Sequence, residues 1–226
     1  MNSDQRETIL GRIREALRAP APRPHSTKLA EPVPAPIQSW LPAVPSKPEQ
    51  RLELFCKNCV ELKTDFFLAR DANEAAQRLD TLKQSKGWSS AASHRHPLVE
   101  PLVTSLGLPT IFVEQGTSIK DLEKCSVGIT ACDLLVAQTG SILLTSRSAG
   151  GRGISVLPPH HVVLAEKRQL VPDLPEAFAY LHRQYGAGFP SFATFITGPS
   201  RTGDIERILV LGAHGPRELT VILIEG

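Results

Sequence analysis

Residues 65–114 of this chain read DFFLARDANEAAQRLDTLKQSKGWSSAASHRHPLVEPLVTSLGLPTIFVE. Short apolar runs alternate here with stretches whose apolar residues recur at helical spacing. The expected strands are 65–69, 89–93 and 110–114, and the expected helices are 71–86 and 98–106. Asp71 followed by Glu74 is typical of a capped helix start. Strands that alternate with helices form parallel sheets, so this stretch predicts an α/β fold with an open, mostly parallel sheet flanked by helices.

Beyond residue 126 the sequence changes to short apolar runs separated by Gly, Ser or Pro, which indicates strands joined by tight turns. We expect strands at 127–130, 134–137, 142–145, 154–157, 162–165, 192–197, 207–212 and 219–224, and a helix at 173–185. Residues 133–137 fit one turn of helix equally well, because a short apolar run has no distinguishing period. Upstream, residues 47–63 are expected to form a helix on which Cys56 and Cys59 lie one turn apart as half-buried packing residues.

The chain is expected to have three parts: an N-terminal helix at 1–18, a tether at 19–48 and an α/β domain at 49–226. Ile9 and Ile13 belong to an apolar stripe on the first helix, with arginines on the opposite face. The tether carries nine of the nineteen prolines, which prevent a helix or a central strand there. A helix this short needs a docking surface, and its own domain, a partner or a second copy of the chain all remain open.

The composition excludes several classes of protein. With 41% hydrophobic and 21% charged residues over 226 positions, the chain is expected to bury a core. Its formal net charge of +2 arises within residues 1–50, so it lacks the basic face that a nucleic-acid partner requires. No apolar run is long enough for a membrane span or a signal peptide, so we expect a soluble, cytoplasmic protein. The four cysteines lack the spacing for an iron–sulfur cluster and no nucleotide-binding fingerprint occurs, so no metal and no cofactor are expected.

Three loops hold residue types that suit ligand binding. The first is Ala-Gln-Thr-Gly-Ser at 137–141, the second is Arg-Ser-Ala-Gly-Gly-Arg-Gly at 147–153, and the third combines 197–204 with 212–216. Glycines beside Ser, Thr and Arg let backbone N–H groups approach an anion, while hydroxyls and a guanidinium complete the site. Each loop alone is better explained as a turn, but loops that follow the strands of an open α/β sheet converge where such folds bind ligands.

Histidines are the first candidates for proton transfer. Histidine is the residue type best suited to proton transfer at neutral pH, which makes His214 the first candidate, and Asp204 could orient it or a substrate hydroxyl. A structural histidine bonded to a turn carbonyl and an aspartate that caps the turn are alternatives that the sequence leaves open. His160 and His161 are interpreted as loop or strand-edge residues, because no carboxylate or cysteine stands at metal-ligand spacing from them.

Two segments carry a resemblance to a known family. Residues 127–163 read VGITACDLLVAQTGSILLTSRSAGGRGISVLPPHHVV, and residues 196–226 read ITGPSRTGDIERILVLGAHGPRELTVILIEG. The first resembles the core signature of the lactate-utilization (LUD) domain, and the second resembles the ending of the same family. The opening ILGRIREAL at 9–17 resembles the N-terminal helix of the lactate utilization protein C subfamily. The resemblance covers 4–18 and 50–226.

The resemblance implies a fold similar to the isomerase and CoA-transferase-like α/β group. It also implies a role in oxidising L-lactate to pyruvate with two iron–sulfur partner proteins. Because this chain shows no cluster ligands, we expect the partners to carry the electrons and the chain to bind the small carboxylate or to organise the partners. The family often has Glu where this chain has Gln138, which argues against a carboxylate nucleophile of the CoA-transferase kind.

On this hypothesis Arg147 or Arg152 clamps the carboxylate and His214 takes the hydroxyl proton. The expected ligand-binding residues are Gln138, Thr139, Gly140, Arg147, Arg152, Gly198, Ser200, Thr202 and Gly215, with His214 and Asp204 as catalytic candidates. Two other hypotheses remain. One is a stand-alone enzyme acting on a phosphosugar or an acyl-CoA, which rests on fold analogy. The other is a non-catalytic scaffold whose N-terminal helix docks on partners.

Overall fold

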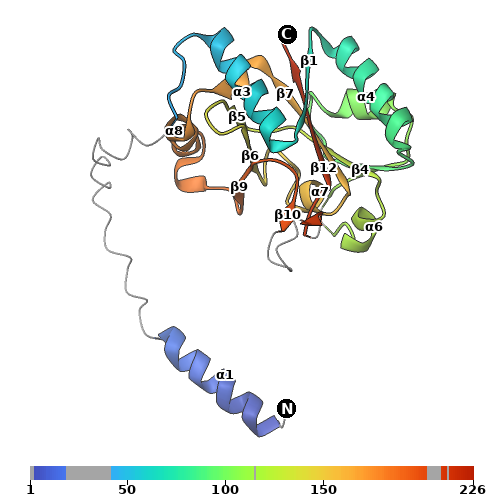
Figure 1. Cartoon of the computed structure of the whole chain (residues 1–226). Coiled ribbons are helices and arrows are strands. Elements are labelled where there is room, and N and C mark those ends of the chain that lie inside the picture. The colour runs from blue at the N-terminus through green and yellow to red at the C-terminus, as the bar shows by residue number, and fades with distance from the viewer. Residues whose placement is uncertain (1–2, 19–41, 115, 203–209, 213) are drawn as a thin grey trace. The chain divides into compact units, whose positions relative to one another are not determined.

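The computed structural model describes residues 3–18, 42–114, 116–202, 210–212 and 214–226 (Figure 1). The helices are α1 (Ser3–Arg18), α3 (Pro48–Leu62), α4 (Ala72–Lys86), α5 (Glu100–Ser105), α6 (Ile119–Glu123), α7 (Gly153–Val156) and α8 (Leu174–Tyr185). The strands are β1 (Asp65–Ala69), β2 (Ala91–Ser93), β3 (Thr110–Phe112), β4 (Val127–Thr130), β5 (Leu134–Val136), β6 (Ser141–Thr145), β7 (His160–Glu166), β8 (Leu170–Val171), β9 (Ala193–Ile196), β10 (Arg201–Thr202), β11 (Val210–Leu211) and β12 (Glu218–Ile224). Short 3-10 turns occupy Lys167–Gln169 and Gly186–Gly188.

The chain divides into two units, residues 1–42 and 43–226. In the first unit, α1 has the expected amphipathic pattern, with Ile9 49% and Ile13 48% exposed. Residues 19–41, which make up most of the predicted tether, lie outside the described residues. The boundaries of the three predicted parts therefore stay a prediction.

Six parallel strands form the main sheet of the second unit, in the order β1-β12-β7-β4-β2-β3. This confirms the predicted α/β class and the mostly parallel sheet. A second sheet has the order β8-β5-β6-β9 and mixes parallel with antiparallel pairs, and β10 pairs antiparallel with β11. The second sheet is made largely from the segment between β4 and β7, where short apolar runs and tight turns were expected.

Successive side chains along the strands of the main sheet point to opposite faces, and each face packs into its own hydrophobic core. On β7, Val162 and Leu164 pack with α4 and α5, whereas Val163 and Ala165 face the other way. This other face is covered by α3, which contributes Phe55, and by the second sheet. The outer side of the second sheet packs against α8. Figure 1 shows α4 to the right of the central strands, and α3, the second sheet and α8 to the left.

Capping residues fix the long helices as the sequence predicts. Asp71 accepts a hydrogen bond from the backbone N–H of Glu74 at the start of α4, and Asp173 does the same for Glu176 at the start of α8. Pro48 begins α3, where its missing N–H has no helical partner to lose.

Two expectations about local structure are wrong. The predicted strand at 154–157 is part of the short helix α7, in which the Ser155 hydroxyl donates to the carbonyl of Arg152. The alternative helical turn at 133–137 is also wrong, because Leu134–Val136 forms strand β5. Short apolar runs have no period that separates the two structures, so tertiary packing decided both cases. Of the predicted strand at 207–212, only residues 210–212 are described, and Val210–Leu211 forms β11.

Candidate functional site

The carboxyl ends of β2, β4 and β7 meet at one edge of the main sheet. The chain leaves β2 toward β3 on one side and leaves β4 toward β7 on the other, so the direction of winding reverses between these strands. Open α/β sheets bind ligands at such a reversal, outside the carboxyl ends of the strands. The residues that follow these strands are His94–His96, Ala131–Asp133 and Lys167–Gln169.

Asp133 is the buried carboxylate of this edge, with only 6% of its surface exposed. The hydroxyl of Tyr185 donates to Oδ1 of Asp133 and also lies 3.3 Å from the hydroxyl of Thr145. Oδ2 of Asp133 is buried and has no hydrogen-bond partner within the described part of the chain. Burial first, and then Asp133, raises the pKa of Tyr185 to about 12, so this hydroxyl stays protonated and keeps donating.

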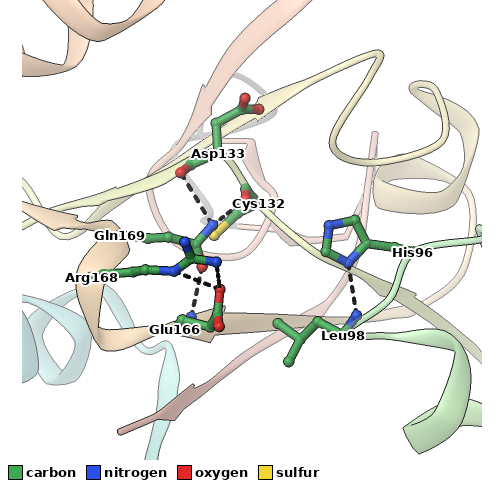
Figure 2. Close-up of polar contacts among 7 residues, drawn as sticks. All are labelled: His96, Leu98, Cys132, Asp133, Glu166, Arg168 and Gln169. Carbon is green, nitrogen blue, oxygen red and sulfur yellow. Dashed lines mark hydrogen bonds and ion pairs between the residues drawn. The ribbon is translucent and has the colours of Figure 1, made fainter. Parts of the chain in front are cut away.

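The Gln169 side chain joins the turn after β7 to the segment that follows β4, and an ion pair lies beside it (Figure 2). The Gln169 side-chain amide donates to the carbonyls of Cys132 at 2.6 Å and Asp133 at 3.2 Å, while its oxygen accepts from the Glu166 N–H. The guanidinium of Arg168 donates to one oxygen of Glu166. Gln169 therefore fixes the backbone at Asp133, whereas the exposed Arg168 would have to leave Glu166 to contact a ligand.

We call the hollow beside these residues the edge pocket. It has a volume of about 260 Å³ and is lined by Asp133, Leu134, Arg168, Gln169 and Tyr180. Burial and the nearby Asp133 raise the pKa of Tyr180. The lining residues of the edge pocket thus include a carboxylate, a cation, a phenol and an amide, and Figure 2 shows the carboxylate of Asp133 pointing away from the guanidinium of Arg168.

His94 closes the edge on the side of β2. Its Nε2 accepts a hydrogen bond from the backbone N–H of Ala131 at 3.2 Å, and burial lowers its pKa to about 4. Gly150 lies against it, since a Cβ at this position would be 2.3 Å from the Cβ of His94. The second predicted loop, residues 147–153, therefore packs on the carboxyl edge through Gly150. This residue has no side chain to clash with His94, and its φ of +62° favours glycine.

The stability of the domain should fall as the pH drops from about 6.5 toward 4. Histidine in the unfolded chain binds a proton near pH 6.5, whereas folded His94 resists protonation down to about 4. The unfolded state therefore gains protons first, and up to about 3 kcal/mol of stability is lost across this window. Urea unfolding between pH 4 and 8 measures the effect. His94→Gln, which still accepts from Ala131, should show a shallower pH dependence, and equal slopes would contradict the explanation.

Four of the residues predicted from the sequence meet in a second hollow, which we call the loop cavity. Gly198, Ser200, His214 and Gly215 line its volume of about 150 Å³. The two halves of the third loop are joined there by backbone hydrogen bonds, from Ser200 to Pro216 and from Gly212 to Ser200. Most of the other lining residues are apolar, and the polar ones among them are Ser155 and His161.

The first loop joins the loop cavity at its margin. The Ser141 hydroxyl donates to that of Thr139 at 2.7 Å and lies 2.8 Å from that of Thr197, which precedes Gly198. Gln138 is buried, and its backbone carbonyl accepts from the Asn58 side chain. Gly140 has a φ of +64° and lies so close to α3 that a Cβ would be 2.8 Å from that of Asn58.

Neither of the two predicted arginines lines the loop cavity or the edge pocket. Arg147 donates to the carbonyl of Gly188 and stacks over Tyr185 at 5.3 Å, whereas Arg152 precedes α7. Asp204 lies outside the described residues, and Thr202 belongs to β10 with its side chain outside them.

Sequence reasoning missed two functional candidates. His161 is fully buried, which lowers its pKa to about 3 and keeps the ring neutral. Its Nε2 lies 2.9 Å from the Thr130 hydroxyl, and its Nδ1 has no partner among the described residues. No sequence signal distinguishes His161 from a packing residue. Asp133 did have a signal, since it is an acidic residue shortly after the apolar run 127–130.

The cysteines have packing roles as far as the structure describes the chain. All four thiols are free. On α3, Cys56 is half-buried as expected, whereas Cys59 is fully buried. Burial raises the pKa of Cys59 to about 12, which keeps it a thiol. Within the described ranges no group of three or more His, Cys, Asp or Glu side chains could hold a metal ion. No helix among the described residues is long and apolar enough to cross a membrane.

The sequence model of the LUD domain family matches residues 52–224. The chain belongs to the LUD domain family. Lactate utilization protein C of Halalkalibacterium halodurans is 36% identical over 185 residues, which cover 78% of this chain and 80% of that protein. The protein of the same name from Geobacillus sp. (strain WCH70) is 41% identical over 104 residues, or 45% of this chain. The matched stretch spans less than half the length of this and the other Geobacillus relatives.

A solved structure shares the fold of this LUD domain. It is a DUF162 family protein from Deinococcus radiodurans, which is 21% identical and superposes with a TM-score of 0.62. The match covers 80% of this chain and 99% of that one. The family resemblance and the α/β fold predicted from the sequence are thus confirmed.

Proposed function

We propose that this chain takes part in the oxidation of L-lactate to pyruvate, as a cytoplasmic subunit that works with two iron–sulfur partner proteins. The names of its relatives, which describe lactate utilization proteins, support the substrate. The four scattered cysteines support electron carriers in the partners rather than in this chain.

The edge pocket is the place where we put the lactate. The observation that carries this assignment is the buried Oδ2 of Asp133, which lacks a partner beside a cavity that also holds Arg168. A buried carboxylate oxygen that lacks a hydrogen-bond donor lowers the stability of the fold. A substrate hydroxyl would supply the missing donor. Rotation about the Cβ–Cγ bond of aspartate is soft, so the carboxylate can turn to meet that hydroxyl.

The chemistry of a 2-hydroxy acid matches this set of groups. The guanidinium of Arg168 offers a fork for the substrate carboxylate once it leaves Glu166, and Tyr180 adds a hydroxyl donor. Asp133 accepts the hydroxyl proton as the C–O bond becomes a carbonyl. The carbon also loses two electrons and a proton. The iron–sulfur partners would accept the electrons, and water would accept the proton.

The loop cavity is the second candidate position for the substrate. There, the residues of the third loop would have the roles that the sequence analysis gave them. His214 would take the hydroxyl proton there, and Ser200 would bind the ligand. The unpartnered Nδ1 of His161 favours a hydrogen-bonding ligand in this cavity. We rank it second because its described lining contains no arginine or lysine to hold a carboxylate.

Reconstitution tests the function. The chain is mixed with the two iron–sulfur proteins of its own lactate utilization system, and lactate-dependent dye reduction is measured with and without it. We expect reduction only when all three proteins are present. Unchanged rates without this chain would reject the subunit role, and turnover of a phosphosugar or an acyl-CoA by the chain alone would establish the stand-alone enzyme instead.

Replacement of His214 by Ala separates the two cavities. With lactate in the edge pocket, His214→Ala should lower the rate of dye reduction less than about threefold, well below the effect of losing a general base. His182→Ala on α8 is the matched control, because His182 is also exposed. A loss of a hundredfold or more confined to His214→Ala would move the substrate to the loop cavity. A scaffold would tolerate both histidine variants and every edge-pocket variant.

A further inference from the structure

A third hollow lies at the opposite edge of the main sheet, where β7 and β12 begin. This amino-edge pocket has a volume of about 460 Å³, and Lys86, Trp88, Lys124, His160, Arg217 and Glu218 are among its lining residues. Pockets of roughly 300–1,000 Å³ hold small organic ligands, whereas an inorganic ion fills far less. Neither the edge pocket nor the loop cavity shares a residue with it.

Buried polar atoms without partners mark the floor of this pocket. Trp88 is 6% exposed, and its indole N–H has no acceptor among the described residues. His160 is 4% exposed, and its Nδ1 lacks a partner as well, although Nε2 lies 2.8 Å from the Thr220 hydroxyl. The two rings pack edge to face at 5.2 Å. An unmade hydrogen bond of a buried donor costs about 1–3 kcal/mol, which a ligand acceptor near Trp88 would offset.

Arg217 supplies the charge that selects the ligand. Lys86 pairs with Glu218 and Lys124 with Asp121, while no described carboxylate pairs with Arg217. The stem of Arg217 packs on Gly212, where a Cβ would be 2.1 Å from the Cγ of Arg217. Its backbone N–H donates to the carbonyl of Pro159 at 2.8 Å. The backbone and stem of Arg217 are thus held at the start of β12, and its guanidinium offers a fork for a carboxylate.

We propose that the amino-edge pocket is a second binding site, which takes a small organic carboxylate whose charged group meets Arg217 and whose apolar body lies toward Trp88 and Pro159. This site is separate from the proposed lactate site. Its occupant differs in size from lactate, because the volume exceeds that of the edge pocket.

The indole N–H signals of the ¹⁵N-labelled full-length chain provide the test. The chain has two tryptophans, and Trp88→Phe assigns their signals, so that of Trp40 serves as an internal reference. Sodium benzoate is the probe, and benzamide is the uncharged control of the same shape. We expect benzoate to move the Trp88 signal saturably and to leave the Trp40 signal in place, while benzamide moves neither.

Arg217→Gln should weaken benzoate binding about tenfold or more, as expected when a charge-assisted hydrogen bond is lost. Arg217 is exposed, so the variant should keep the amide spectrum of the folded chain. Lys57→Gln removes an exposed cation on α3 and should leave binding unchanged. An unsaturable shift, an equal response to benzamide or to inorganic phosphate, or unchanged affinity in Arg217→Gln would each overturn the proposal.

Discussion

Replacement of Asp133 by Asn is expected to slow lactate-dependent dye reduction by the reconstituted system about a hundredfold or more. General bases contribute roughly 10²- to 10⁴-fold to enzymatic rates, and the amide cannot take the hydroxyl proton. Asn has the size of Asp, and its carbonyl oxygen can still accept from Tyr185, so the fold should survive. The measurement is kcat and KM for lactate, with the urea unfolding midpoint as a check on folding.

Two further variants separate proton transfer from packing. Arg168 is exposed, so Arg168→Gln should leave stability unchanged and raise KM about tenfold or more through the lost carboxylate contact. Asp80→Asn, on the outer surface of α4, is the matched control and should change neither constant. Asp133→Asn with full activity, or with a rate lowered only as far as its stability is lowered, would remove Asp133 from the chemistry.

Gly128→Ala should destabilise the domain by at least about 3 kcal/mol, the upper range for overpacking a core. Gly128 lies in β4, paired with β2 on one side and β7 on the other. A Cβ there would be 2.1 Å from the backbone carbonyl oxygen of Ile154 in α7. Because that oxygen belongs to the backbone, α7 as a whole would have to move.

Urea unfolding of Gly128→Ala measures the loss, and Gly11→Ala is the control. A Cβ at Gly11 meets nothing within 4 Å. Alanine is the better helix former by about 1 kcal/mol, so this change in α1 should not weaken the unit formed by residues 43–226. A loss below about 1 kcal/mol in Gly128→Ala would show that α7 is free to shift, contrary to the packing described.

The sequence predicted those helices and strands that a short stretch of neighbouring residues is enough to specify. Asp71 with Glu74 predicted the start of α4, and the alternation of strands with helices over residues 65–114 predicted the parallel sheet. The sequence did not separate the strand β5 from a helical turn, and it misassigned α7 as a strand. In both places the run is too short to show a period, and contacts with distant segments decide the structure.

The candidate site was predictable only in part, for the same reason. The two halves of the third loop were grouped by their closeness in sequence, and backbone hydrogen bonds join their described residues. The edge pocket joins the start of β5 and the residue before it with the turn after β7 and with α8, and no local pattern relates Asp133 to Arg168 or Tyr180. Arg147 was expected at a ligand, but its guanidinium is used by Gly188 and Tyr185.

The position of β12 in the main sheet limits the order in which the domain can fold during synthesis. This strand follows every other strand in the chain, yet it lies between β1 and β7 in the sheet. During synthesis on the ribosome, β1 is among the first segments to emerge and has no neighbour until residues 218–224 have been translated. Until then, the unpaired backbone edges of β1 and β7 can associate with other chains. Nascent chains of this protein should therefore depend on chaperones for longer than a sheet whose strands pair in the order of translation.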